Sequence, residues 1–186
     1  SSRRAAALTQ RLLAFSRRQP LDSRALDLQE AFDGLQSLLR STCGENIALE
    51  LELPQGLWNI FTDAHQFDNA ILNLAVNARD AMPGGGRLRI QACNLVLDAP
   101  LPAHGLEAGE YVRLSVADTG TGMPQAVAQR AFDPFFTTKP IGQGTGLGLS
   151  MIYGYMRQTG GLAVIESQVG EGTKVSMLFP RCFEAV

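Results

Sequence analysis

The sequence lacks the features of a membrane span, a disulfide-stabilised protein and a zinc site. It has only three cysteines, far apart and without a C-x-x-C pair, at Cys43, Cys93 and Cys182. This usage is typical of a protein in a reducing cytosol. No apolar stretch approaches the roughly 20 residues that a membrane helix needs, and no signal-peptide pattern stands at the beginning. We therefore expect a cytoplasmic segment without membrane contact.

Lysine is also scarce, since only Lys139 and Lys174 occur among 16 basic residues. The net charge of −2 hides an uneven distribution: residues 1–24 hold six Arg and one Asp, which leaves 10 basic against 17 acidic residues elsewhere. A basic arm of this kind binds nucleic acid or belongs to a helix with another partner. With 186 residues, 45% of them hydrophobic, the chain is long enough for one well-buried core.

Residues 3–18 predict an amphipathic helix. Apolar residues recur at spacings of three and four, at Ala5, Leu8, Leu12 and Phe15. The stripe is narrow, as in a helical bundle or a coiled coil, so this helix needs partner helices. Pro20 ends it, because the residue before a proline avoids helical geometry. We expect a bundle helix over 1–19, a linker over 20–24 and a folded domain over 25–183.

The domain alternates strand and helix patterns. Period-two alternation and turn residues predict strands at 26–28, 47–53, 58–61, 88–97, 111–117, 162–167 and 173–179. Period-3.6 patterns predict helices at 29–42, 64–82, 125–132 and 149–158. The last two strands form a hairpin with its turn at 170–172. The expected fold class is α+β, a mixed and mostly antiparallel sheet with helices on one face.

The helix at 64–82 has an unusual polar face. A 100° step per residue gathers its core side from Phe67, Ile71, Leu74, Ala78 and Met82, and its polar side from Gln66, Asn69, Asn73, Asn77 and Asp80. Asparagine is a mediocre helix former, so its recurrence on one face of a helix needs an explanation. One explanation is a solvated face. The other is that Asn77 offers a neutral oxygen to Mg²⁺, with Asn73 one turn earlier beside it.

The motif DTGTGM at 118–123 follows a predicted strand. The Asp118 carboxylate can accept a hydrogen bond from the exocyclic amine of adenine, which guanine lacks at that position. Gly120 and Gly122 would let a flat ring approach the backbone closely. The alternative is an Asx turn at the end of a strand, with no ligand.

Glycine occupies every second position from 142 to 148, before a helical pattern. Exposed backbone N–H groups and a helix N-terminus favour phosphate. A P-loop is excluded because no Lys-Ser or Lys-Thr pair follows the last glycine, and the Rossmann spacing is absent. Lys139, in the preceding aromatic segment 132–139, either places a positive charge on a terminal phosphate or is solvated.

Five motifs in this order resemble the N, G1, F, G2 and G3 boxes of the histidine-kinase catalytic domain: NLAVNARDAM, DTGTGM, FDPFFTTK, GQGTGLGL and GEGT. That domain belongs to the ATP-binding superfamily shared with gyrase, a heat-shock chaperone and mismatch-repair proteins. The resemblance covers about residues 25–180. It implies a two-layer α/β sandwich of the Bergerat type that takes ATP and Mg²⁺ as cofactors.

The resemblance also implies residue roles. Asn77 holds Mg²⁺, Asp118 reads adenine, residues 132–148 form a mobile lid and Thr173 lies near the base. The implied catalytic residues are Asn73, Asn77 and Lys139, and the nucleotide-binding set is Asn73, Asn77, Asp80, Asp118, Gly120, Gly122, Met123, Phe132, Thr138, Lys139, Gly142, Gly144, Thr145, Gly146, Leu147, Gly148, Leu149 and Thr173. Asn73 stands where the gyrase branch has a glutamate that activates water. Since an amide cannot act as a general base, we expect phosphoryl transfer rather than hydrolysis.

Residues 1–19 resemble the second helix of the dimerisation and phosphoacceptor hairpin that precedes such domains. We expect the acceptor histidine on the first helix of that hairpin, absent from this chain, because neither His65 nor His104 has the flanking pattern of an acceptor. The implied partners are this dimerisation domain and a response regulator receiver, in a homodimeric parent that does not bind nucleic acid. The alternatives are a catalytically silent nucleotide-sensing module and a hydrolytic ATPase.

Overall fold

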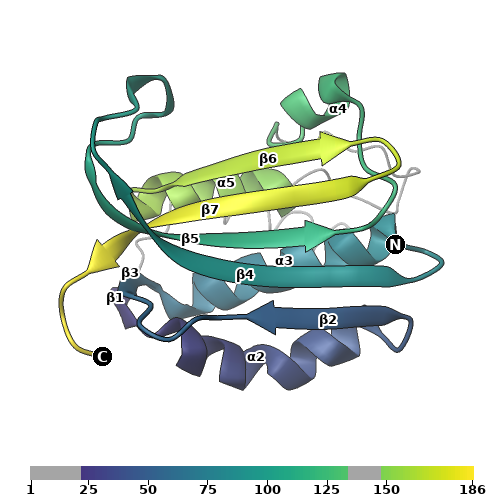
Figure 1. Cartoon of the computed structure of the whole chain (residues 1–186), viewed down its shortest axis with the longest axis horizontal. Coiled ribbons are helices and arrows are strands. Elements are labelled where there is room, and N and C mark those ends of the chain that lie inside the picture. The colour runs from purple at the N-terminus through teal and green to yellow at the C-terminus, as the bar shows by residue number, and fades with distance from the viewer. Residues whose placement is uncertain (1–21, 134–147) are drawn as a thin grey trace, which may run out of the picture.

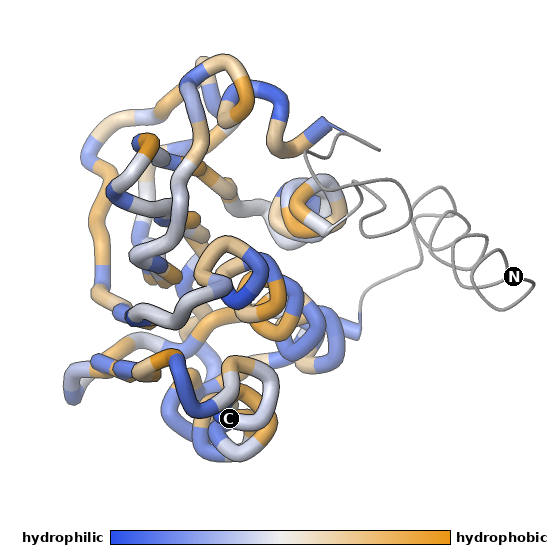
Figure 2. The backbone as a smooth tube through the Cα atoms, turned by 90° about the vertical axis from the view of Figure 1, so that its right-hand side faces the viewer, coloured by the Kyte–Doolittle hydropathy of each residue, from blue (hydrophilic) through white to orange (hydrophobic). Residues whose placement is uncertain are grey.

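The computed structural model of the protein describes residues 22–133 and 148–186. They form two layers, a twisted sheet and a set of helices gathered on one of its faces (Figures 1 and 2). None of the helices in these two ranges is long and apolar enough to cross a membrane. The predicted helix at 3–18 and the greater part of the predicted lid lie outside the described residues.

Within the described residues the sheet has seven strands: β1 Ser23–Leu26, β2 Ile47–Glu52, β3 Asn59–Asp63, β4 Gly86–Leu97, β5 Gly109–Asp118, β6 Leu162–Gln168 and β7 Gly172–Cys182. Their order is β1-β3-β7-β5-β4-β2, and β6 pairs with β7 beside this path. The β2–β4 pair is parallel, whereas the other pairs are antiparallel. The expected mixed and mostly antiparallel sheet is therefore confirmed.

The helices are α2 Leu28–Cys43, α3 Ala64–Ala81, α4 Gln125–Gln129 and α5 Gly148–Thr159, with a short 3₁₀ helix η1 at Pro102–His104. The short strand predicted at 26–28 is present but displaced: β1 ends at Leu26, because Asp27 caps α2 by accepting a hydrogen bond from the Glu30 N–H at 3.1 Å. The strand instead begins at Ser23, two residues before the predicted start of the domain. Asp63 caps α3 in the same way, through the Gln66 N–H.

The core lies between α2, α3 and the sheet. The ring of Phe67 packs between those of Phe32 and Phe179, with centroids 5.8 and 5.9 Å apart, and all three side chains are fully buried. The predicted apolar face of α3 is buried as a whole. Fully burying one such side chain contributes about 1.5–3 kcal/mol. This packing fixes the rotation of α3 and hence the direction of its polar stripe.

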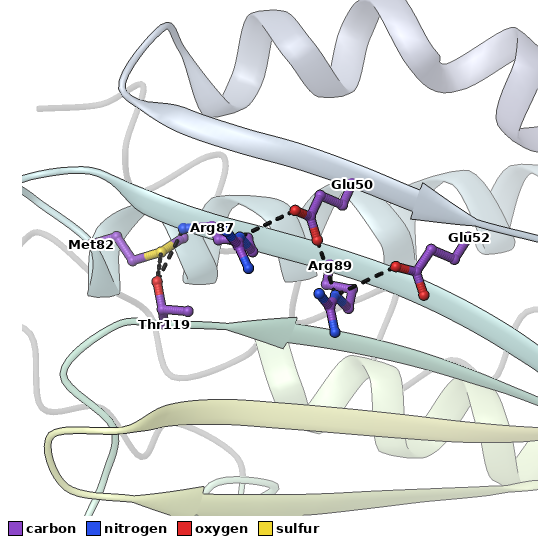
Figure 3. A network of polar contacts seen from close by, with 6 residues as sticks. All are labelled: Glu50, Glu52, Met82, Arg87, Arg89 and Thr119. Atoms are coloured by element: carbon purple, nitrogen blue, oxygen red, sulfur yellow. Dashed lines mark hydrogen bonds and ion pairs between the residues drawn. The ribbon is translucent and has the colours of Figure 1, made fainter.

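The opposite face of the sheet carries a polar ladder across β2 and β4 (Figure 3). Glu50 forms ion pairs with Arg87 at 3.1 Å and with Arg89 at 3.0 Å, and Arg89 is 3.7 Å from Glu52. These groups are partly exposed, so each pair contributes little stability. On the same face, the connection between β4 and β5 covers a second small core made of Leu106, Tyr111, Leu162 and Leu178.

Candidate nucleotide-binding site

Asp118 is the last residue of β5, and within the described residues hydrogen bonds reach only one of its two carboxylate oxygens. Its Oδ1 accepts hydrogen bonds from the backbone N–H of Gly120 at 2.9 Å and of Thr173 at 3.3 Å. In residues 22–133 and 148–186, no hydrogen bond reaches Oδ2. Burial raises the pKa of Asp118, and the two backbone hydrogen bonds oppose that shift without cancelling it. The Asx turn expected as the alternative is thus present, and it leaves one oxygen for a ligand.

Gly120 and Gly122 are required by the packing of the protein itself. A Cβ at Gly120 would lie 2.5 Å from the carbonyl oxygen of Ala81, at the end of α3. A Cβ at Gly122, where φ is +68°, would overlap the carbonyl oxygen of Gln168. The absent side chains therefore let the turn fit between α3 and the β6–β7 hairpin. Close approach of a ligand ring, the role expected from the sequence, is not needed to explain them.

Ser167 joins this turn to the hairpin, and the sequence analysis missed it. Its Oγ accepts a hydrogen bond from the Met123 N–H at 2.8 Å and lies 2.7 Å from the Thr173 Oγ1. It also donates to the carbonyl of Gly172 at 3.1 Å. The signal was available, because Ser167 ends one predicted strand and Thr173 begins the next, so the predicted hairpin pairs them. The structure therefore brings Asp118, Met123 and Thr173 together.

The polar stripe of α3 reaches the same end of the sheet. Ala81 lies one helical turn after Asn77 and accepts a hydrogen bond from the Thr121 N–H at 3.0 Å. On its other side, Asn77 meets the first turn of α5, since a Cβ at Gly148 would lie 3.6 Å from the Asn77 Nδ2. The buried hydroxyls of Tyr155 and Thr62 share a hydrogen bond that fastens α5 to β3. Hence Asn77 lies between the DTGTGM turn and the end of the glycine run.

The amides of Asn73 and Asn77 are partly exposed. Neither has a hydrogen-bond partner within the described parts of the chain. A neutral amide oxygen suits Mg²⁺, which usually takes few protein ligands and completes its shell with phosphates and water. Asn77 therefore fits as a single protein ligand of Mg²⁺. No group of three or more His, Cys, Asp or Glu forms a metal site within residues 22–133 and 148–186.

The other predicted residues fall into two groups. Asp80 accepts a hydrogen bond from Arg79 at 3.3 Å, Phe132 stacks on Tyr153 with ring centroids 5.4 Å apart, and Leu149 packs against the main core. The predicted residues that lie outside the described ranges are Thr138, Lys139, Gly142, Gly144, Thr145, Gly146 and Leu147.

Comparison with known proteins identifies the kind of domain. The family model described as "Histidine kinase-, DNA gyrase B-, and HSP90-like ATPase" matches residues 62–182, more than half of the chain. The chain belongs to this family. The matched range contains the α3 stripe, the DTGTGM turn and the closing hairpin. The resemblance to a histidine-kinase ATP-binding domain, with its Bergerat-type sandwich, is thereby confirmed.

The relatives of this histidine-kinase-type ATP-binding domain are sensor kinases. Sensor kinase CckA of Brucella abortus is 45% identical over 186 residues, which cover 99% of this chain and 20% of the relative. Two-component sensor PprA of Pseudomonas aeruginosa is 34% identical over 178 residues, covering 93% of this chain and 18% of the relative. The chain thus spans about a fifth of the length of these relatives.

Solved structures share the fold of this ATP-binding domain. Full-length ShkA, crystallised with AMPPNP, matches with a TM-score of 0.77 and 24% identity over 97% of this chain and 36% of that chain. ThkA in complex with the response regulator TrrA matches with a TM-score of 0.69 and 21% identity over 96% of this chain and 48% of that chain. At these identities the likeness shows the fold alone.

Proposed function

We propose that this domain binds ATP with Mg²⁺ and donates the γ-phosphoryl group to a histidine of its parent sensor kinase. The observation that carries the proposal is the Asp118 carboxylate, whose Oδ1 is engaged by two backbone N–H groups while Oδ2 has no partner in the described residues. Membership of the ATPase family and the names of the relatives support the same reading.

Adenine recognition follows from the chemistry of that oxygen. An ionised carboxylate only accepts hydrogen bonds, so Oδ2 of Asp118 suits the exocyclic amine of adenine and repels a carbonyl oxygen at the same place. A site built to hydrogen-bond one group rejects an analogue that lacks it. We therefore infer a preference for ATP over GTP.

The metal and the transfer step involve the α3 stripe. When bound, Mg²⁺ would supply charge neutralisation at the phosphates, and Asn77 would be its protein ligand. In the step itself, an imidazole nitrogen of the acceptor attacks the γ-phosphorus. A P–N bond forms, the bond to the bridging oxygen breaks, and ADP leaves. Asn73 cannot take a proton from water, so nothing at its position favours hydrolysis.

The partners follow from the relatives. ThkA has been crystallised with a response regulator, and this supports a receiver domain as the final acceptor for the parent of this chain. We infer that residues 1–19 belong to the dimerisation and phosphoacceptor hairpin of a homodimeric parent. The same proposal places the domain in the cytoplasm, where the response regulator is found. Lys139 and the glycine run at 142–148 would close over the phosphates.

The test supplies the hairpin of the parent protein in trans. The chain, ATP labelled at the γ-phosphate and Mg²⁺ are incubated with the hairpin, and phosphohistidine and inorganic phosphate are both measured. We expect label on the hairpin. We expect Asn77→Ala to reduce it by about tenfold or more, because a metal ligand is lost. The matched control is Asn69→Ala, an exposed residue of the same stripe nearer the start of α3. Nucleotide binding without transfer, or steady phosphate release without label on histidine, would contradict the proposal.

A further inference from the structure

Strand β6 is an edge of the sheet. It pairs antiparallel with β7 over its whole length, from Leu162 opposite Leu178 to Gln168 opposite Gly172. In the described part of the chain no strand pairs with its other edge. Figure 1 shows β6 along the upper border of the sheet, with α4 above its C-terminal end.

A cleft of about 1080 Å³ runs along this edge. Residues 162–169 form its floor without interruption, so the backbone of β6 itself lines it. One wall comes from α4 and the other from the β4–β5 connection, with side chains of α5 between them. These walls include His104, Phe132, Tyr153 and Arg157. Neither Asp118 nor Asn77 lines this cleft, whereas Met123 and Phe132 of the predicted nucleotide-binding set do, so the cleft adjoins the nucleotide site without containing either residue.

The cleft offers backbone hydrogen-bonding groups. In an antiparallel edge strand, alternate residues direct both N–H and C=O away from their partner strand. Among the described residues, no backbone hydrogen bond joins residues 162–167 to any segment other than β7. Natural sheets usually protect such an edge with charge, proline or a covering element. Within the described residues this edge lies in a walled groove, which can admit one extended chain but not a whole second sheet.

The side chains around the edge specify the occupant. On the helix side, Tyr153 lines the cleft together with Ala163 and Ile165; it is 40% exposed, and its ring centroid lies 5.4 Å from that of Phe132. At the N-terminal end of β6, Arg157 donates from Nη1 to the His104 carbonyl at 2.9 Å, which leaves other guanidinium donors for a ligand. At the C-terminal end, the Met123 N–H donates to the Ser167 Oγ at 2.8 Å, which joins the DTGTGM turn to β6.

We propose that β6 binds an extended segment of a partner protein by strand addition. The segment runs antiparallel to β6, the slightly more stable arrangement. Its helix-side residues are apolar where they meet Tyr153, and the last of them is acidic to pair with Arg157. The proposal goes beyond nucleotide binding and does not depend on it.

The test uses the blocked peptide Thr-Val-Thr-Val-Thr-Asp and the whole chain. Its valines and aspartate share one face of a strand, as the cleft requires. We expect the peptide to protect alternate backbone amides of β6 from hydrogen exchange at concentrations up to about 1 mM, the range of a weak interface. Two further peptides are N-methylated, one at the valines and one at the threonines. Only the version whose methyl groups face β6 should lose binding.

A charge reversal tests the end contact. Arg157→Glu should weaken binding by about tenfold or more, and a peptide ending in lysine should restore it. The matched control, Arg113→Glu, changes an exposed arginine on β5 that does not line the cleft and should leave peptide binding unchanged. ATP affinity, measured in the same samples, should stay unchanged. Absence of amide protection in β6, or equal binding of both N-methylated peptides, would overturn the proposal.

Discussion

The substitution Ser167→Ala tests whether the DTGTGM turn depends on the β6–β7 hairpin. The Ser167 hydroxyl makes three hydrogen bonds, with the Met123 N–H, the Gly172 carbonyl and the Thr173 hydroxyl, at 2.7 to 3.1 Å. No other side chain in the described structure joins these three places. Its removal leaves the turn attached to the hairpin by the Asp118 carboxylate, which accepts from the Thr173 N–H at 3.3 Å, and by backbone contacts such as the Gly170 N–H to the Thr121 carbonyl at 2.8 Å.

The expected magnitude follows from these contacts. Each hydrogen bond contributes a net 0.5–1.5 kcal/mol or so, and partial exposure lets water replace part of the loss, so we expect about 2 kcal/mol of lost unfolding free energy. For a chain of this length that corresponds to a fall in Tm of about 4–8 °C. ATP affinity should fall by about three- to tenfold, because Thr173, which donates to Asp118, loses its support.

The assay combines thermal unfolding with calorimetric titration of ATP and Mg²⁺. Ser176→Ala is the matched control, since it removes one buried hydroxyl pair with Ser115, 3.2 Å apart, away from the site. It should cost about 1 kcal/mol and leave ATP affinity unchanged. Ser167→Thr keeps the hydroxyl and should restore most of the affinity. An alanine variant at 167 with the wild-type Tm and affinity would refute the role assigned to this residue.

Two further predictions concern the same turn. Gly122→Ala should lower the unfolding free energy by about 2–4 kcal/mol, because φ is +68° and the new Cβ would overlap the Gln168 carbonyl; Gly34→Ala, in open space within α2, should instead raise it by about 0.5–1 kcal/mol. The unfolding free energies of both variants are measured by urea unfolding. An unfolding free energy for Gly122→Ala equal to or above that of Gly34→Ala would contradict the geometry. Burial raises the pKa of Asp118. On acidification, ATP affinity should therefore begin to fall at a higher pH than it would with an ordinary aspartate. The unfolding free energy should decrease as the pH rises through the same interval, since the folded state holds that proton more tightly. Titrations across pH should show both effects, and Asp118→Asn should abolish both.

The helical pattern of α3 made much of the fold and site predictable. Its 3.6-residue period separates Phe67 from Asn73 and Asn77 without any knowledge of the sheet. The hairpin around Gly170 was predictable for the same reason, since short-range turn chemistry decides it. Where one local rule acts alone, sequence and structure agree.

Other features depend on contacts between distant segments. The alternation in β2 gives no sign that it pairs parallel with β4, because either direction buries Ile47 and exposes Glu50. Gly120 is required because a Cβ there would collide with the carbonyl oxygen of Ala81, which is far away in the chain. An interpretation based on the DTGTGM motif alone therefore assigns this glycine to ligand binding. The edge cleft on β6 likewise arises only when α4 and the connection containing His104 fold beside the strand.

The proposed function depends most on recognition of adenine by the Asp118 carboxylate at the end of β5. Calorimetric titration of ATP and GTP into the wild-type chain and Asp118→Asn, with Mg²⁺ present, tests it most directly. Asp98→Asn, in an exposed loop, is the control. We expect ATP to bind the wild type more tightly than GTP, and Asp118→Asn to weaken ATP binding by at least about tenfold, because a charged hydrogen-bond partner is lost. Unchanged ATP affinity in Asp118→Asn, or equal affinity of the wild type for ATP and GTP, would contradict it.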